Sequence, residues 1–201
     1  MSDHPVVMAV TGASGAPYAV RLLEGLLAAE RRVQLIVSSH GLRLLRTEVD
    51  IDSIEALRVR VGAEAWDRCV TCFDDADRGA APASGSALNA GMVICPCSMG
   101  TVSAIAAGSS RSLVERAADV ALKERRPLIL VPRETPLSMI HLENMLRVTR
   151  AGAVVMPAAP GFYHRPRSIQ DLVDFVVARV LDHLSVPHTL GSRWAGETPD
   201  E

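Results

Sequence analysis

The stretch Val6-Val-Met-Ala-Val-Thr-Gly-Ala-Ser-Gly-Ala-Pro17 decides the fold of this 201-residue chain. It joins a continuous apolar run, Val6–Val10, to a turn that contains two glycines, and four leucines follow at helical spacing between positions 22 and 27. A short continuous apolar run is typical of a strand that is covered on both faces. The stretch therefore predicts a buried parallel strand, a tight turn and an amphipathic helix.

The same alternation of short apolar runs and helical patterns recurs along the chain. Further runs lie at Val33–Val37, Val70–Phe73, Met92–Cys95, Leu128–Val131 and Val154–Met156. Helical stripes lie at Leu113, Ala117, Val120 and Ala121, and at His141, Met145 and Leu146. The clearest stripe runs from Ile169 to Leu184, with Ser168 as N-cap and Asp171 three residues on. We predict an α/β fold, a Rossmann-like three-layer sandwich around a mostly parallel, doubly wound sheet.

The length predicts one domain over residues 1–186 and a C-terminal tail over residues 187–201. Residues 79–89 are rich in Gly, Ala, Ser and Pro, which predicts a mobile loop. Hydrophobic residues make up 48% of the chain, enough for a sizeable core.

Composition also excludes several classes of function. The net charge of −2 argues against a general nucleic-acid binder, and 3% aromatic content against a base-stacking platform. No apolar run approaches the roughly 20 residues of a membrane span, and the first residues lack signal-peptide features. We therefore expect a cytoplasmic protein.

Four cysteines, at positions 69, 72, 95 and 97, are then expected to be reduced thiols. Cys72 lies within the predicted strand Val70–Phe73 and Cys69 directly before it, and residues three apart along a strand face opposite sides. Cys95 and Cys97 close another strand. We expect buried or half-buried thiols rather than a zinc site.

Polar and glycine-bearing loops follow the predicted strands, where ligands bind in such sheets. These loops are Thr11–Pro17, Ser38–Gly41, Cys97–Thr101, Pro132–Pro136 and Pro160–Pro166. The first and third place a hydroxyl and a glycine at a helix N-terminus, which favours a phosphate. The first loop matches neither a dinucleotide fingerprint, nor a Walker A loop, nor a nucleophile elbow. In the second loop, serines stand where dinucleotide-binding folds usually have an acid that binds the adenosine ribose. This disfavours a dinucleotide and is compatible with a mononucleotide.

Other residues in these loops carry more than one interpretation. Ser14 is either a helix cap or a ligand to phosphate, and Glu48 is either helix surface or a group that reaches the cleft. Arg133 can fork onto a phosphate or a flavin carbonyl, and Glu134 beside it could be only its ion-pair partner.

Several motifs together resemble the UbiX-type flavin prenyltransferases over nearly the whole chain. The motifs are Thr11-Gly-Ala-Ser-Gly-Ala16, Pro82-Ala-Ser-Gly-Ser86, Ile94-Cys-Pro-Cys-Ser98, the segment from Glu115 to Pro127, Val131-Pro-Arg-Glu134, His141-Leu-Glu-Asn-Met145, Met156-Pro-Ala-Ala-Pro-Gly-Phe-Tyr163 and Asp171-Leu-Val-Asp-Phe-Val176. The resemblance implies transfer of a dimethylallyl group from dimethylallyl phosphate to N5 and C6 of reduced FMN, without a metal. The prenylated FMN would serve UbiD-type decarboxylases, as in ubiquinone biosynthesis. The resemblance also implies a homododecamer with active sites at subunit interfaces.

The resemblance further assigns site residues by matching motifs. It implies FMN contacts from Gly12, Ala13, Ser14, Ser38, Ser98, Met99, Gly100, Thr101 and Arg133. It implies substrate contacts from Arg116, Lys123, Tyr163, Arg179 and Trp194, and catalytic roles for Ser14, Glu48, Lys123 and Glu134. By pattern alone, Arg116, Lys123 and Arg179 are equally interpreted as charges on solvated helix faces.

Two alternative functions share these features. One is an FMN-dependent cysteine decarboxylase of the same fold, although His40 and the segment from His141 to Asn144 fit its expected histidine poorly. The other is a flavin carrier, which would normally stack aromatic residues on the flavin. The flavin loops predicted here contain none. Binding of a prenyl phosphate separates both from the prenyltransferase.

Overall fold

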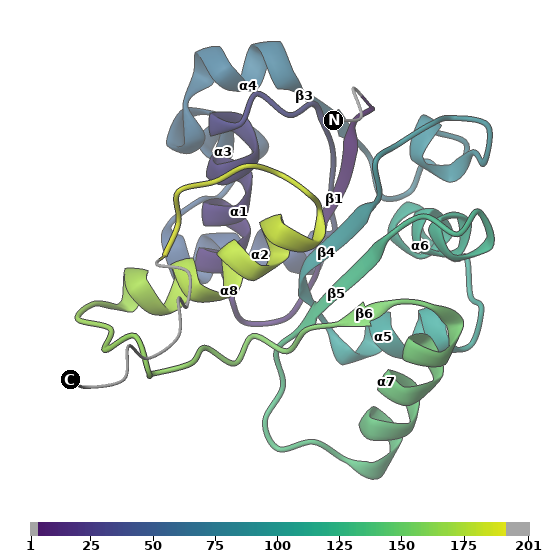
Figure 1. Ribbon diagram of the computed structural model, residues 1–201. Helices are drawn as coiled ribbons and strands as arrows, with labels where there is room; N and C mark the ends of the chain where they lie inside the picture. The colour runs from purple at the N-terminus through teal and green to yellow at the C-terminus, as the bar shows by residue number, and fades with distance from the viewer. Residues whose placement is uncertain (1–3, 192–201) are drawn as a thin grey trace.

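A computed structural model describes residues 4–191. It contains a six-stranded sheet in the order β3-β2-β1-β4-β5-β6, and every neighbouring pair is parallel (Figure 1). The strands are β1 (Val6–Val10), β2 (Val33–Val37), β3 (Val70–Phe73), β4 (Met92–Cys97), β5 (Leu128–Pro132) and β6 (Val154–Val155). The predicted fold class is confirmed, with a sheet that is parallel throughout.

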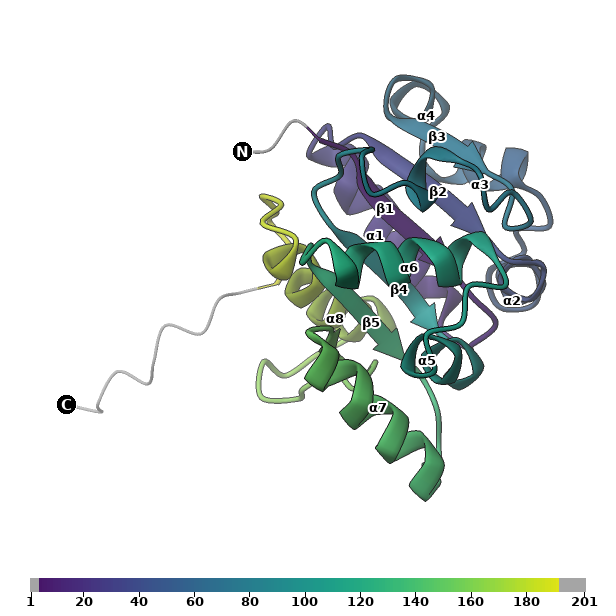
Figure 2. The same cartoon turned by 90° about the vertical axis from the view of Figure 1, so that its right-hand side faces the viewer.

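Helices cover both faces of this sheet (Figures 1 and 2). They are α1 (Ala16–Ala28), α2 (Ser39–Val49), α3 (Ile54–Val61), α4 (Ala63–Cys69), α5 (Met99–Ala106), α6 (Leu113–Lys123), α7 (Met139–Ala151) and α8 (Ile169–His183). Side chains of β1 alternate between two cores, as a strand requires. Val6, Met8 and Val10 pack with α1 and α8, whereas Val7 and Ala9 pack with α5 and α6.

The bounds of β1, β2 and β3 are those predicted from the apolar runs. Strands β4 and β5 run further, to Cys97 and Pro132, and β6 ends one residue early. Helices α3 and α4 have no clear signal in the sequence pattern. Each of these helices buries one residue, Leu57 in α3 and Trp66 in α4, so neither has an apolar stripe.

The loop expected at residues 79–89 contains a short 3-10 helix over Ala81–Ala83 with a buried proline. Arg126 donates hydrogen bonds to the carbonyls of Gly85 and Ala87 in the same loop. Composition predicted the irregular backbone but not this anchoring.

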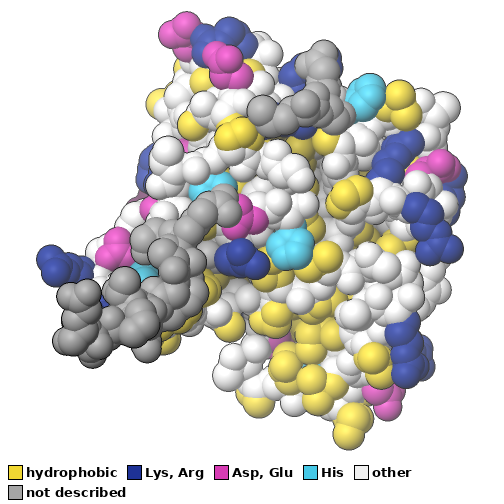
Figure 3. All heavy atoms as spheres, viewed as in Figure 1, with side chains coloured by type: hydrophobic (Ala, Val, Ile, Leu, Met, Phe, Trp, Pro, Cys, Tyr) yellow, Lys and Arg dark blue, Asp and Glu magenta, His cyan; other side chains and the backbone are white. Residues whose placement is uncertain are grey.

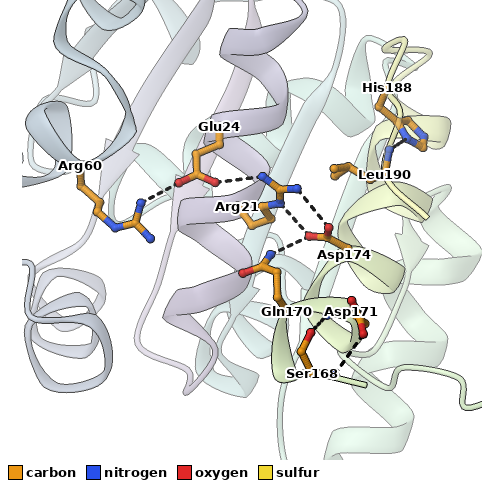
Figure 4. A network of polar contacts seen from close by, with 9 residues as sticks. All are labelled: Arg21, Glu24, Arg60, Ser168, Gln170, Asp171, Asp174, His188 and Leu190. Atoms are coloured by element: carbon orange, nitrogen blue, oxygen red, sulfur yellow. Dashed lines mark hydrogen bonds and ion pairs between the residues drawn. The ribbon is translucent and has the colours of Figure 1, made fainter. Parts of the chain in front are cut away.

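A polar network fixes α8 against α1 (Figure 4). Arg21 of α1 donates from Nε and Nη2 to the two carboxylate oxygens of Asp174, at 2.7 and 3.0 Å. Glu24 accepts from Arg21 and from Arg60 of α3. The fork geometry sets the position of α8 along α1.

Two helix predictions need correction. The capping box of Ser168 and Asp171 is confirmed, but Ile169 is 78% exposed and does not belong to the buried stripe of α8. On α7 the buried residues are Asn144 and Val148, whereas Leu146 of the predicted stripe is exposed.

Helix α7 and the residues just before it instead present an apolar surface, the α7 apolar patch, made of Leu137 before the helix and of Met139, Ile140, Leu142 and Leu146 on it. Figure 3 shows hydrophobic side chains gathered at the lower end of the molecule, where Figure 1 places α7. Contiguous exposed apolar surface of this kind marks an interaction site.

The cysteines lie in different environments. Cys95 and Cys97 are buried and Cys69 is half-buried, but Cys72 is exposed, so the expectation of four covered thiols is wrong for Cys72. Burial raises the pKa of Cys95 to about 12, so this thiol is neutral at physiological pH. Within residues 4–191, no cluster of three or more His, Cys, Asp or Glu is arranged to hold a metal ion. The helices described there include none that is both long and apolar enough to span a membrane.

Candidate active site at the carboxyl edge of the sheet

Helices α1, α2, α5 and α6 begin at the carboxyl edge of the sheet, beside the loops after β1 to β4. Helices α1, α2 and α5 directly follow β1, β2 and β4. Helix α6 begins there too, because the backbone N–H of Leu113 donates to the carbonyl of Asp75, just after β3, at 2.7 Å. Each helix N-terminus presents unpaired N–H groups that can bind an anion. Which of them are already occupied decides where a phosphate can bind.

The N-terminus of α1 is occupied by a carboxylate of the protein. Oε2 of Glu48, on α2, accepts hydrogen bonds from the backbone N–H groups of Gly15 and Ala16, at 2.8 and 2.7 Å. The first turn was expected to offer these N–H groups to an anion, and that expectation is wrong. Glu48 therefore contacts the glycine turn after β1 and is half-buried, although it does not line the cavity formed by α2 and α5.

The N-terminus of α6 is occupied in a similar way. Oδ1 of Asp75 accepts from the N–H of Val114 at 3.0 Å, and Ser112 caps the helix through Glu115 N. Glu115 in turn accepts from the backbone N–H of Arg111 at 2.8 Å. Two carboxylates thus stand at this helix end, which disfavours an anion there.

The N-termini of α2 and α5 carry neutral caps instead. The Oγ atoms of Ser38 and Ser98 accept from the N–H groups of Gly41 and Thr101, both at 3.1 Å. Ser98 Oγ also lies 2.9 Å from Thr101 Oγ1. These two first turns line one cavity of about 320 Å³, together with Thr11, Gly12, His40, Asp75, Ser112, Val114 and Glu115. On the side of α2 and α5 the cavity offers hydroxyl groups and two helix dipoles to a phosphate, whereas the wall at α6 carries the carboxylates of Asp75 and Glu115.

Thr11 connects the turns that form this cavity. Its buried Oγ1 donates to the carbonyl of Pro96 at 3.0 Å and accepts from the N–H of Ser98 at 2.8 Å. The hydroxyl therefore fixes the end of β1 relative to the start of α5.

We expect Thr11→Val to destabilise the fold by about 1–3 kcal/mol, because the isosteric change leaves a buried N–H and a buried carbonyl without this partner. Urea denaturation measures the loss. Thr47→Val on the exposed face of α2, where the hydroxyl bonds only to its own helix, is the matched control and should change stability by less than about 0.5 kcal/mol. Equal effects of the two changes would contradict the bracing role of Thr11.

Gly12 has no room for a side chain at the floor of the cavity. A Cβ at this position would lie 2.6 Å from the Cβ of His40. The glycine thus lets the turn after β1 approach the first turn of α2, and both contribute to the cavity wall.

The cavity lining does not include the other predicted FMN residues, which are Ala13, Ser14, Met99, Gly100 and Arg133. Nε of Arg133, at the end of β5, donates to the carbonyl of Ser14 at 3.1 Å, which links these two predictions directly. Ala13 and Met99 are buried, at 6% and 5% exposure, so their side chains pack inside the protein. Glu134 follows Arg133, is exposed, and accepts from Thr135 N at 3.3 Å.

The structure does not bring the predicted substrate residues to this cavity within one chain. Arg116 lies one turn into α6 and pairs with Asp119 at 2.7 Å. Lys123 lies at the other end of α6, about 14 Å along the helix from Val114, and pairs with Glu124. Figure 2 shows α6 running back against the strands, so that it ends near the start of β5.

The two remaining described substrate residues lie on the α8 side of the sheet. Tyr163 lines a separate cavity of about 270 Å³ beside α8. Arg179, on α8, is 57% exposed at its side chain and pairs with Asp182 at 3.2 Å. Trp194 lies outside the described residues.

Sequence reasoning missed two carboxylates in the cavity wall, Asp75 and Glu115. Asp75 belongs to the acidic run Asp74-Asp75-Ala76-Asp77 that follows β3. The rule that ligands bind after the strands could have found it, had it been applied to β3.

Known proteins show the same sequence pattern. The family model described as Flavoprotein matches residues 1–181. The flavin prenyltransferase UbiX of Pseudomonas aeruginosa is 51% identical over 195 residues, which cover 94% of this chain and 93% of the relative. The chain belongs to the UbiX-type flavin prenyltransferase family.

Solved structures of this family have the same fold. The crystal structure of AnUbiX (PadA1) in complex with FMN and dimethylallyl pyrophosphate superposes with a TM-score of 0.89 at 39% identity, covering 97% of this chain and 99% of that one. A dodecameric FMN-dependent UbiX-like decarboxylase from Escherichia coli O157:H7 superposes at 0.87 and 40% identity, covering 96% and 100%. The family resemblance predicted from the motifs is confirmed.

Proposed function

We propose that this chain transfers the dimethylallyl group of dimethylallyl phosphate to N5 and C6 of reduced FMN. One observation carries the FMN site. Carboxylates occupy the N-termini of α1 and α6, whereas Ser38 and Ser98 cap the N-termini of α2 and α5, and the latter two first turns line one cavity. That cavity fits the phosphate of a mononucleotide. The family membership of the chain supports FMN as this mononucleotide.

The flavin then extends from this phosphate site toward the turn that carries Ser14. The residues that hold the flavin mononucleotide are Gly12, Ala13, Ser14, Ser38, Ser98, Met99, Gly100, Thr101 and Arg133. Arg133 is already oriented by the carbonyl of Ser14 and can also donate to a flavin carbonyl. Glu48 accepts a hydrogen bond from the backbone N–H of Gly15, the residue after Ser14. Ser14 and Glu48 therefore lie close together and can transfer the proton at N5.

The remaining proposed residues act on the prenyl phosphate. The first bond forms at N5, which loses its proton, as the allylic carbon separates from the phosphate oxygen. A proton then adds to the CH carbon of the prenyl double bond, the tertiary carbon bonds to C6, and C6 loses its proton. The phosphate and the allylic chain are held by Arg116, Lys123, Tyr163, Arg179 and Trp194. These residues also neutralise the charge of the departing phosphate. Glu134 or the phosphate itself accepts the proton from C6.

A homo-oligomer, as in the dodecameric relative, would complete this site. Lys123 and the FMN cavity lie at opposite edges of the sheet in one chain, so a single subunit cannot bring them together without refolding. The α7 apolar patch provides a surface that a second subunit can cover. We therefore propose a dodecamer whose active sites combine residues of neighbouring subunits.

Ile140→Glu should break this assembly into smaller species, because it places a charge in the middle of the α7 apolar patch, where Ile140 is 68% exposed. Light scattering after size-exclusion chromatography measures the mass. Val59→Glu replaces another exposed apolar residue, on α3, and should leave the mass unchanged. An unchanged mass for Ile140→Glu would exclude the patch from the interface.

The product defines the proposed partner. Prenylated FMN is a cofactor that this chain would release to a UbiD-type decarboxylase, as in ubiquinone biosynthesis. A cytoplasmic location fits the four cysteines, each of which carries a free thiol.

The function is tested by anaerobic turnover of reduced FMN with dimethylallyl phosphate or the diphosphate, with a chelator present. The reaction mixture is then added to an inactive UbiD-type decarboxylase that lacks its cofactor. Decarboxylase activity that depends on this chain and on a prenyl donor is the expected result. Activity that appears only after the chelator is omitted would overturn the metal-free reaction, and no activity would overturn the prenylation.

A further inference from the structure

An aromatic cluster surrounds Tyr163 on the surface of α8. We propose that His164 and Phe175 are positioning residues that fix the ring of Tyr163, so that its hydroxyl meets the phosphate of the prenyl donor. The inference rests on the proposed function, in which Tyr163 contacts that phosphate.

The ring geometry carries the inference. The rings of His164 and Phe175 are stacked, with centroids 5.2 Å apart and planes 10° apart. The ring of Tyr163 meets both edge-on, at 5.7 Å from Phe175 and 5.8 Å from His164. Edge-to-face contact with two partners restricts the ring of a tyrosine that is otherwise 63% exposed.

The backbone of the loop is shaped to the same cluster. A Cβ on Gly161 would lie 3.0 Å from both Phe175 Cζ and Tyr163 Cε1, so the glycine leaves room for the two rings. Arg165 adopts a left-handed φ of 52°, and its N–H closes a turn onto the carbonyl of Phe162 at 3.0 Å. The loop thus reverses at the point where His164 turns toward α8.

His164 contributes through its ring face rather than through its nitrogens. Both ring nitrogens are buried, and neither has a hydrogen-bond partner among the described residues. A phenylalanine has a flat ring of similar size, so it can replace this histidine in the stack.

The position of Phe175 is itself fixed by the network between α1 and α8. Its neighbour Asp174 accepts the two-pronged contact from Arg21, and α8 begins with the capping box of Ser168 and Asp171 (Figure 4). The cluster therefore connects a rigid helix to a loop residue that contacts substrate, and this is how a scaffold orients a binding group.

The test measures the KM for dimethylallyl phosphate and kcat in the assembled protein, with FMN binding as the check on folding. Phe175→Leu and His164→Ala should each raise this KM about 5- to 10-fold, the effect of one lost aromatic contact, with kcat and FMN affinity little changed. His164→Phe should restore the KM to within about twofold of the unmodified protein. Phe162→Leu, on an exposed ring of the same loop, is the matched control and should leave the KM unchanged.

Tyr163→Phe distinguishes the positioning role of His164 and Phe175 from the proposed contact between Tyr163 and the phosphate, because it keeps the ring and removes the hydroxyl. A raised KM for Tyr163→Phe with an unchanged KM for Phe175→Leu and His164→Ala would overturn the positioning role alone. An equal rise in Phe162→Leu, or no rescue by His164→Phe, would also overturn it. An unchanged KM for Tyr163→Phe would instead overturn the proposed contact between Tyr163 and the phosphate.

Discussion

Glu48→Gln lowers the rate of flavin prenylation by about 100-fold or more, the usual effect of losing a positioned acid or base. Its Oε2 accepts from Gly15 and Ala16 at 2.8 and 2.7 Å, immediately after Ser14. A glutamine oxygen can accept the same two hydrogen bonds, so the turn and the fold are retained. The amide cannot exchange a proton, so the rate falls while FMN affinity is nearly unchanged.

Single-turnover kinetics under anaerobic conditions measure this rate, and flavin titration measures the affinity. Glu48→Ala provides the comparison, because it also removes the cap of α1 and should destabilise the fold by about 1 kcal/mol. A normal rate for Glu48→Gln with a stability loss for Glu48→Ala would mean that Glu48 is only a helix cap.

Lys123→Ala also abolishes most turnover, yet hybrid oligomers of this variant with Glu48→Gln regain activity. The reason is geometric, because α6 places Lys123 at the edge of the sheet opposite to the turn that Glu48 contacts. In a site built from two subunits, random mixing gives about a quarter of the sites both unmodified side chains. We expect that fraction of the original activity.

Co-expression of the two variants with different affinity tags yields the hybrids, and each variant alone is the control. The flavin affinity of Lys123→Ala should be unchanged, because Lys123 lies away from the FMN cavity. Hybrids as inactive as their parents would contradict a site that is shared between subunits.

The sequence predicted the sheet well because burial on both faces leaves a clear local signal. The five-residue runs that became β1 and β2 are almost wholly apolar and end at a turn. Helices α3 and α4 were not predicted, because each buries one side chain and therefore shows no apolar stripe at helical spacing. Helix α7 was assigned the wrong face, because the sequence cannot tell apolar side chains of a core from those of an exposed patch.

The candidate site was predictable as a set of loops but not as a set of contacts. The strand-end rule found the serines that line the cavity, since carboxyl ends of parallel strands meet at one edge. It could not predict that Glu48 fills the N-terminus of α1, because that contact depends on how α2 packs against α1. The same rule, applied to the end of β3, reaches Asp75, but it could not predict that Asp75 binds the first turn of α6, a helix distant in sequence.

The most direct test of the account is the mass of the flavin after one anaerobic reaction. The purified protein is mixed with reduced FMN and dimethylallyl phosphate, and the flavin is released and measured by mass spectrometry. The account predicts a flavin that is heavier by one five-carbon prenyl unit, formed only when protein and donor are both present. An unchanged flavin, from a protein that binds FMN, would contradict it and favour a cysteine decarboxylase or a flavin carrier.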